Sequence, residues 1–172
     1  MPLIDTPARA TAPSFSQPEF RQALGMFATG VTIVTACNAS GTLVGLTANS
    51  FNSVSLSPPL VLWSLAKAAG SMATFSAGSH YAINILSASQ QRLAQQFASK
   101  TLDRFQGVPF TFSQTGVPIL DGAVAVFECF NRSQYEEGDH VIFVGEVERC
   151  SYTAGASPLL YHGGKFYAEH PL

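Results

Sequence analysis

Residues 45–59, with the sequence GLTANSFNSVSLSPP, form the stretch of this chain that is richest in side chains able to bind a ligand. Hydroxyl and amide groups come from Thr47, Asn49, Ser50, Asn52, Ser53, Ser55 and Ser57, and no charged residue lies among them. A loop that faces water usually also contains Lys, Glu or Asp. Neutral donors and acceptors therefore favour a flat, uncharged heterocycle such as a flavin or a pterin. The alternative interpretation is a polar surface loop, because Ser and Asn are common in turns.

A second group of residues is suited to binding phosphate. Lys67 is the only formally charged residue within residues 22–91, and Ser71 begins a short predicted helix. An ammonium group, a hydroxyl and the N–H groups of a helix start together favour a phosphate, although most lysines are simply solvated. Lys100 and Arg104 follow a later predicted helix, where they either join Lys67 around a phosphate or cap the helix C-terminus.

The third candidate is His140, which directly follows Gly138 and Asp139 in a predicted hairpin turn. Glycine in this turn supplies the positive φ that a tight hairpin requires. Taken alone, a histidine after a hairpin turn is typical of a surface residue. Asp139 either accepts a hydrogen bond from the ring and so fixes its tautomer, or only caps the turn.

Hydrophobic periodicity and capping residues predict the elements that position these side chains. Capping boxes that begin at Ser16 and Ser87 each open a helix, and the first of these helices is amphipathic. Further helix and strand patterns follow along the chain. The predicted helices start at residues 16, 71 and 87, and the predicted strands span residues 31–36, 43–47, 60–64, 81–86, 123–134 and 140–152.

These strands do not alternate with helices as βαβ units, and no Gly-x-Gly-x-x-Gly follows a strand, so a doubly wound sheet is not supported. The pattern predicts a mainly β protein with short helices, folded as a closed or nearly closed antiparallel barrel. Such a barrel holds a ligand at its mouth or at a subunit seam. We expect one domain over residues 16–172, preceded by a flexible leader over residues 1–15.

The composition excludes several classes of protein. Charged residues make up 12% of the 172 residues, against about 25% in a typical soluble domain. No apolar run reaches the roughly 18 residues of a membrane helix, so we expect a surface that a subunit, a ligand or both cover. The net charge of −2 gives no basic footprint for nucleic acid. Three cysteines and four scattered histidines without ligand spacing predict no metal site, and indicate reduced thiols in a cytoplasmic protein.

Several segments together resemble one known family. The segments are residues 20–35 (FRQALGMFATGVTIVT), 45–59, 138–140 (GDH), 158–161 (PLLY) and 164–167 (GKFY). In this order they are similar to the short-chain flavin reductase family, whose members are reductase components of two-component flavin-dependent monooxygenases. The resemblance covers residues 20–167 and is more specific than any single motif.

The resemblance implies an FMN-binding split barrel, a homodimer, and hydride transfer from NADH or NADPH to FMN or FAD. It also implies release of the reduced flavin to a separate oxygenase. The cofactors carry this chemistry, so the protein has to stack and align two rings. The cofactor-binding candidates are Gly45, Thr47, Ala48, Asn49, Ser50, Ser64, Leu65, Lys67, Ser71, Lys100 and Arg104.

The same resemblance places His140 beside the nicotinamide as the catalytic candidate. Asp139, Phe166 and Tyr167 are the further nicotinamide-binding candidates. Aromatic residues near the C-terminal end of a domain are more often part of a core, and this alternative stays open for Phe166 and Tyr167. Two other functions also stay open: a flavoprotein that retains FMN for electron transfer or flavin binding, and a split-barrel oxidase of the pyridoxamine-phosphate type.

Overall fold

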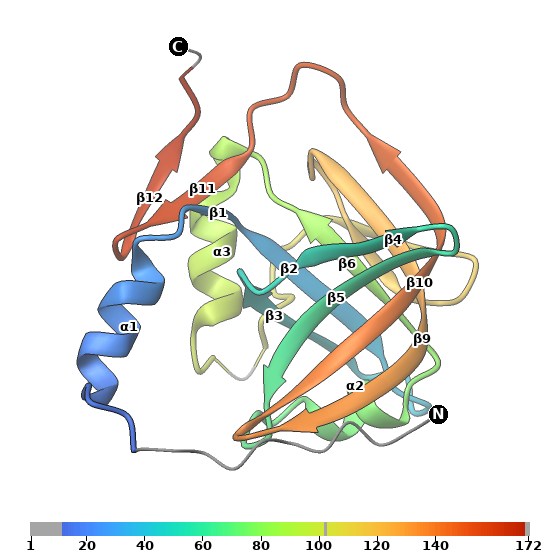
Figure 1. Cartoon of the computed structure of the whole chain (residues 1–172). Coiled ribbons are helices and arrows are strands. Elements are labelled where there is room, and N and C mark those ends of the chain that lie inside the picture. The colour runs from blue at the N-terminus through green and yellow to red at the C-terminus, as the bar shows by residue number, and fades with distance from the viewer. Residues whose placement is uncertain (1–11, 102, 171–172) are drawn as a thin grey trace.

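Figure 1 shows the structure, a computed structural model that describes residues 12–101 and 103–170. Residues 1–11 of the predicted leader lie outside the described residues. A seven-stranded antiparallel sheet of order β3-β2-β6-β9-β10-β5-β4 dominates the fold. The prediction of a mainly β protein with short helices is confirmed. The strands of this sheet are β2 (Thr32–Cys37), β3 (Leu43–Ala48), β4 (Asn52–Leu56), β5 (Pro59–Ala66), β6 (His80–Ile85), β9 (Ala125–Glu137) and β10 (His140–Tyr152).

Smaller elements flank this sheet. A three-stranded sheet has the order β1-β11-β12, and β7 pairs with β8. Apart from the three helices, none of these short elements was predicted from the sequence. Their bounds are β1 (Thr29–Gly30), β7 (Phe110–Phe112), β8 (Pro118–Leu120), β11 (Leu159–His162), β12 (Lys165–Ala168), α1 (Gln17–Gly25), α2 (Met72–Ala77), η1 (Ala88–Gln90) and α3 (Gln91–Ala98).

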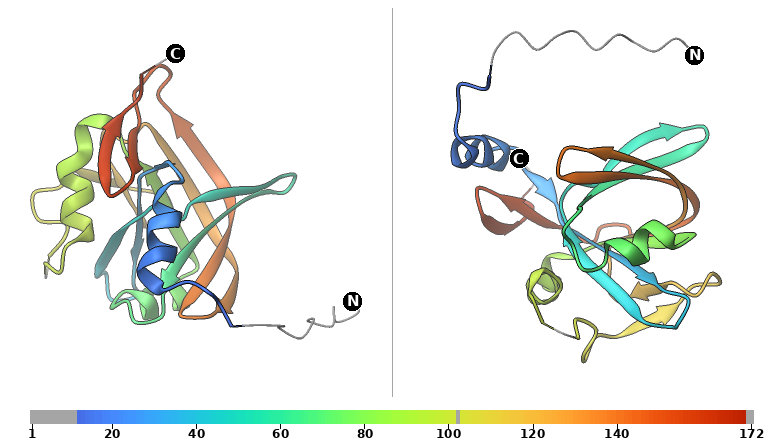
Figure 2. Two further views of the ribbon diagram at one scale, coloured as in Figure 1. Left: turned by 60° about the vertical axis from the view of Figure 1, so that its left-hand side comes forward. Right: turned by 90° about the horizontal axis from the view of Figure 1, so that it is seen from below.

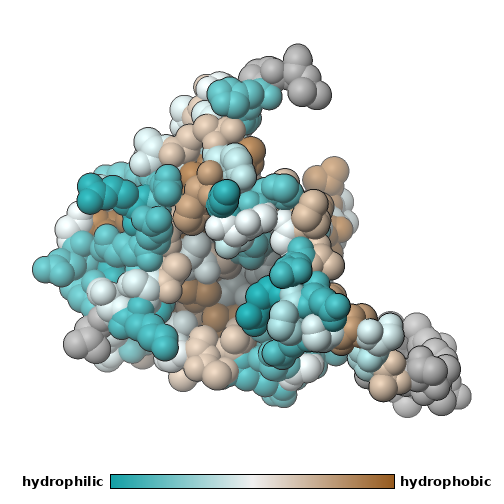
Figure 3. All heavy atoms as spheres, turned by 90° about the vertical axis from the view of Figure 1, so that its left-hand side faces the viewer, coloured by the Kyte–Doolittle hydropathy of each residue, from teal (hydrophilic) through white to brown (hydrophobic). Residues whose placement is uncertain are grey.

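Both predicted capping boxes are present, at the start of α1 and of the η1–α3 segment. The apolar side chains of α1 and of the segment just after it, however, are largely uncovered by the described residues. Phe20, Leu24 and Phe27 are 49%, 59% and 75% exposed. The face of the molecule that carries α1 is hollowed, and apolar and polar side chains mix on it (Figure 3). The apolar side of this amphipathic helix is therefore largely exposed in the described part of the chain.

The main core lies on one face of the curved sheet. Trp63, Phe75, Tyr81 and Phe143 are buried and pack as an aromatic cluster. Along β5, buried and half-buried residues alternate, as the two-residue period of a strand requires. Trp63 thus faces the core, and Ser64 next to it is left for the other face.

The two edges of the main sheet, β3 and β4, are consecutive in the chain but lie at opposite ends of the strand order. Residues 49–51 connect them, so the curvature of the sheet has to bring its two ends close together (Figure 2). The sequence predicted no strand at β4. Its apolar residues Val54 and Leu56 are 49% and 95% exposed, so pairing with β5 rather than burial forms this strand.

Candidate active site

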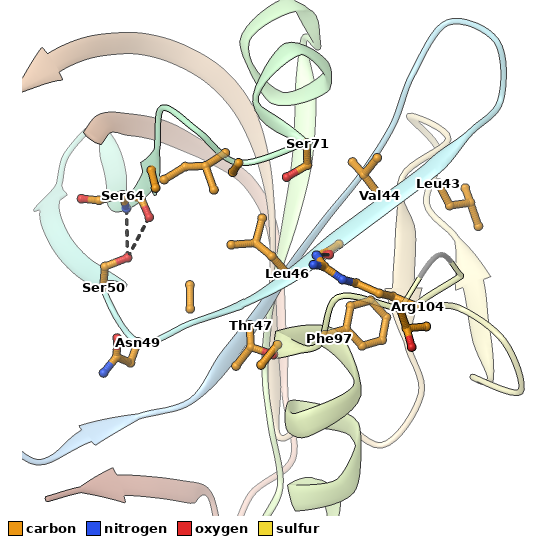
Figure 4. Close-up of a pocket in the computed structure, with 18 of the residues that line it drawn as sticks. Leu43, Val44, Leu46, Thr47, Asn49, Ser50, Ser64, Ser71, Phe97 and Arg104 are labelled. Atoms are coloured by element: carbon orange, nitrogen blue, oxygen red, sulfur yellow. Dashed lines mark hydrogen bonds between the residues drawn. The ribbon is translucent and has the colours of Figure 1, made fainter. Parts of the chain in front are cut away.

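A cavity of about 650 Å³ opens between the two ends of the main sheet (Figure 4). It is formed by β3, the connection to β4, the end of β5, the start of α2 and the segment that follows α3. Its volume is within the range of small-molecule and cofactor sites. The predicted site residues that line it are Gly45, Thr47, Ala48, Asn49, Ser50, Ser64, Leu65, Ser71, Arg104 and His140.

The connection between β3 and β4 contributes unpaired main chain to this cavity. The N–H groups of Asn49 and Ser50, which both line it, have no hydrogen-bond acceptor among the described residues. The Ser50 hydroxyl instead accepts a bond from the Ser64 N–H at 3.0 Å and donates one to the Ser64 carbonyl at 3.3 Å. Free main-chain donors beside hydroxyls fit the carbonyl and ring-nitrogen edge of a planar heterocycle.

Strand β3 is fixed against α3 at two of the predicted cofactor-binding residues, which also line the cavity. The Thr47 hydroxyl donates to the Ala94 carbonyl at 2.6 Å, so it has only lone pairs left for a ligand. At Gly45, an added Cβ would lie 2.5 Å from the Phe97 ring. Gly45 lines the cavity, but the close approach of Phe97 is what requires a glycine there.

Arg104 is the permanent cation of the cavity. Its guanidinium donates to the Ser99 carbonyl through Nε and Nη2, at 3.0 and 2.7 Å, and to the Gly45 carbonyl through Nη1 at 2.9 Å. No carboxylate pairs with it in the described part of the chain. Because a guanidinium has five N–H donors, two remain. Lys100, its predicted companion, does not line the cavity.

Lys67 does not line the cavity either. Its ammonium group lies 2.9 Å from a carboxylate oxygen of Glu136, and its main-chain N–H donates to the Asp139 carbonyl at 2.9 Å. Both contacts tie β5 to the turn between β9 and β10. The sequence contained no indication that Glu136 pairs with Lys67, because the two residues are far apart in the chain and meet only through strand pairing.

That turn carries Asp139 and His140. Gly138 has a φ of 57°, as the predicted turn requires. A carboxylate oxygen of Asp139 lies 2.7 Å from His140 Nδ1, so the first of the two alternatives for Asp139 is the observed one. This hydrogen bond, the charge of His140 and the nearby Lys67 hold the pKa of Asp139 below its ordinary value. With Nδ1 bound to Asp139, Nε2 of His140 is the nitrogen left for a ligand.

A second cavity of about 450 Å³ adjoins the first and shares Thr47 and Asn49 with it. Its wall contains Tyr161 and Phe166, whose ring centroids are 5.3 Å apart, and small residues of α3. No residue with a formal charge lines it among those described. Tyr167 is 47% exposed and lines neither cavity. The nicotinamide candidates are therefore divided, with His140 at the first cavity and Phe166 at the second.

Two classes of feature are not found in the described residues. No group of three or more His, Cys, Asp or Glu side chains is arranged to hold a metal ion. No helix within residues 12–101 and 103–170 combines the length and the apolar character needed to cross a membrane.

The sequence profile described as the flavin reductase like domain matches residues 24–170, most of the chain. The chain belongs to the flavin reductase like family. The resemblance inferred from the sequence motifs is thereby confirmed. This flavin reductase like chain is 46% identical over 147 residues to the "FMN reductase (NADH) SmoA" of Agrobacterium fabrum, covering 86% of this chain and 83% of the relative.

Another relative is longer than this chain. The reductase component of the flavin-dependent trigonelline monooxygenase of Acinetobacter baylyi is 42% identical over 149 residues, 87% of this chain but only 48% of the relative. Among solved structures, the NADH:FAD oxidoreductase SgcE6 of Streptomyces globisporus, in complex with NAD and FAD fragments, superimposes with a TM-score of 0.86. It is 39% identical, and the match covers 90% of this chain and 93% of that one.

Proposed function

We propose that this chain is an NADH-dependent flavin reductase that reduces FMN or FAD and supplies the reduced flavin to a separate monooxygenase. The observation that carries the proposal is the cavity between the sheet ends. It combines neutral hydroxyls, free main-chain N–H groups and one cation without a carboxylate partner, in a chain of the flavin reductase like family.

The residues of this cavity fit a flavin in two parts. The N–H groups of Asn49 and Ser50 suit the polar edge of an isoalloxazine ring. Arg104, with its two spare N–H donors, and Ser71 suit a phosphate. Because Lys67 pairs with Glu136 outside the cavity, we assign the phosphate to Arg104 in place of Lys67.

The protein has to position two rings and withdraw them from water. A flavin held by these residues would supply the hydride-accepting chemistry, and NADH would supply the hydride. The free N–H groups of Asn49 and Ser50 would stabilise negative charge at a ring edge placed against them. No strong acid–base pair is required. Among the described residues that line the cavity, the ionisable ones are Asp103, Arg104 and His140.

The nicotinamide is assigned to the junction of the two cavities. His140, with Asp139 holding Nδ1, presents Nε2 as the polar contact. Tyr161 and Phe166 supply an uncharged aromatic wall on the other side of Thr47 and Asn49. This arrangement lets a neutral ring approach the flavin from a side that contains no competing charge.

Release of the product follows from the modest polarity of the site. One cation and several neutral groups hold an anionic flavin less tightly than a cluster of arginines would. Weak retention suits a reductase whose product serves a separate oxygenase. The relative from Acinetobacter, itself named a reductase component, supports this assignment.

We further propose that the main sheet closes as a split barrel and that the chain forms a homodimer in the cytoplasm. The Ser50–Ser64 bonds join the two sheet ends and support the barrel. Exposed apolar side chains on α1 (Phe20 and Leu24) and directly after it (Met26 and Phe27) support a subunit interface. The three free cysteines suit a reducing compartment.

Steady-state oxidation of NADH, measured with and without added FMN or FAD, tests the proposed reaction. We expect the rate to depend on free flavin and to saturate with it. A protein that purifies with stoichiometric FMN, and whose NADH oxidation does not accelerate when flavin is added, would instead be the FMN-retaining flavoprotein.

A further inference from the structure

Ser50 lies where the chain crosses from one end of the main sheet to the other. Strand β3 ends at Ala48, and β4 begins at Asn52 beside β5. Within the described residues, the Ser50 hydroxyl is the side-chain group that hydrogen-bonds the β3–β4 connection to β5 (Figure 4). The cavity opens at this point, so the bonds of Ser50 fix one side of its mouth.

The strand register shows that the Ser50 hydroxyl takes the place of a main-chain ladder pair between Ser50 and Ser64. In the β4–β5 ladder Asn52 lies opposite Leu62. Continuing that antiparallel register by two residues places Ser50 opposite Ser64. The main chain of Ser50 does not make this pair, and its side chain takes both main-chain groups of Ser64 instead, at 3.0 Å to the N–H and 3.3 Å to the carbonyl.

Because the Ser50 side chain bonds Ser64, the main chain of residues 49–51 makes no ladder hydrogen bonds to β5. If Ser50 paired through its backbone, its own N–H and carbonyl would be used in the ladder. As the structure stands, the N–H groups of residues 49–51 have no protein acceptor among the described residues, although Ser50 and Phe51 are half-buried. Half-buried donors without a partner are costly unless a ligand or water meets them.

We propose that Ser50 is a positioning residue that clasps the two sheet ends and so presents the free N–H groups of Asn49 and Ser50 to the flavin. Its proton is committed to the Ser64 carbonyl, so Ser50 acts through this clasp and does not donate to the ligand. The identification of the ligand as a flavin rests on the proposed function. The hydrogen bonds between Ser50 and Ser64, which form the clasp, do not depend on it.

Hydrogen exchange of the Ser64 amide in the flavin-free protein tests the clasp. In Ser50→Ala this amide loses its acceptor, and we expect its exchange to accelerate about tenfold. Ser50→Thr retains a hydroxyl and should restore slow exchange. Ser53→Ala is the matched control, because the exposed Ser53 hydroxyl on β4 makes no hydrogen bond in the described structure. Unchanged exchange in a folded Ser50→Ala protein would overturn the clasp.

Quenching of FMN fluorescence on the same proteins tests the positioning role. We expect Ser50→Ala to raise the Kd for FMN about tenfold, as the loss of two ordinary hydrogen bonds predicts. Ser50→Thr and Ser53→Ala should bind as the unaltered protein does. Faster Ser64 exchange together with unchanged FMN binding would overturn the positioning role. If the unaltered protein bound no FMN, the proposed function would fail, and the exchange experiment would still judge the clasp.

Discussion

The two cavities share Thr47, Asn49 and Ala98, but they differ in the charge of the residues that line them. The first, of about 650 Å³, contains Asp103, Arg104 and His140, whereas the second, of about 450 Å³, is lined by neutral and aromatic residues. A fixed cation selects an anionic group, and an uncharged aromatic wall selects a flat ring. The difference suggests separate roles, in which the first cavity binds the flavin phosphate and the second contacts the nicotinamide ring.

The largest effect is expected when the cation of the first cavity is removed. Arg104→Ala should raise the KM for FMN about 10- to 100-fold, because a hydrogen bond to a charged group contributes about 1.5–3 kcal/mol. The KM for NADH should change little. Steady-state kinetics with FMN and with riboflavin, which lacks the phosphate, measure this difference.

Two comparisons make the Arg104 experiment decisive. Lys67→Ala should leave the KM for FMN nearly unchanged, because Lys67 pairs with Glu136 outside the cavity. An equal loss for riboflavin and FMN in Arg104→Ala would contradict phosphate binding. It would mean that Arg104 acts only by fastening Ser99 to Gly45.

The second cavity predicts the opposite pattern for Phe166. Phe166→Ala should raise the KM for NADH about tenfold and spare FMN binding, since a stacked aromatic pair contributes about 0.5–1.5 kcal/mol beyond its buried area. Tyr167→Ala is the control, because Tyr167 is exposed and lines neither cavity. Equal effects of the two changes would remove the second cavity from the reaction.

His140 tests whether the division between the cavities is complete. It lines the charged cavity, yet we assign it to the nicotinamide. His140→Ala should raise the KM for NADH about fivefold, as the loss of one hydrogen bond predicts, and leave the Kd for FMN unchanged. Weaker FMN binding with normal NADH kinetics would place His140 on the flavin side instead.

The smallest effect concerns the pH dependence of the Asp139–His140 contact. The pKa of Asp139 lies below its ordinary value of 3.8, so its charged form is favoured in the folded state. A carboxyl with a lowered pKa adds stability above its unfolded pKa, and this stability disappears as the pH falls through the folded pKa. Denaturant unfolding of the unaltered protein and of Asp139→Asn should differ slightly above about pH 5 and converge below pH 3.8. A difference that grows on acidification would contradict this sign.

Local patterns in the sequence predicted local structure well. The capping boxes at Ser16 and Ser87, the turn at Gly138 and the pairing of Asp139 with His140 all involve residues close together in the chain. The strand β4 escaped prediction because its apolar residues are exposed and leave no burial pattern. The second cavity was not predicted either, because α3 and the β11–β12 hairpin come together only in the folded chain.

The sequence by itself determined the family and the mainly β class, and it singled out the segment from Gly45 to Ser50, which lines the first cavity. Motifs, caps and strand periods are short-range properties, so the sequence alone contains them. Only the tertiary structure decided which basic residue faces the cavity. The sequence offered three basic residues as equal candidates: Lys67, Lys100 and Arg104. Strand pairing brings Glu136 to Lys67. The carbonyls of Ser99 and Gly45 hold Arg104 at the cavity wall. A cationic side chain can bind a ligand only if some of its N–H donors are not already bonded within the protein. The tertiary structure determines which protein groups bond to it.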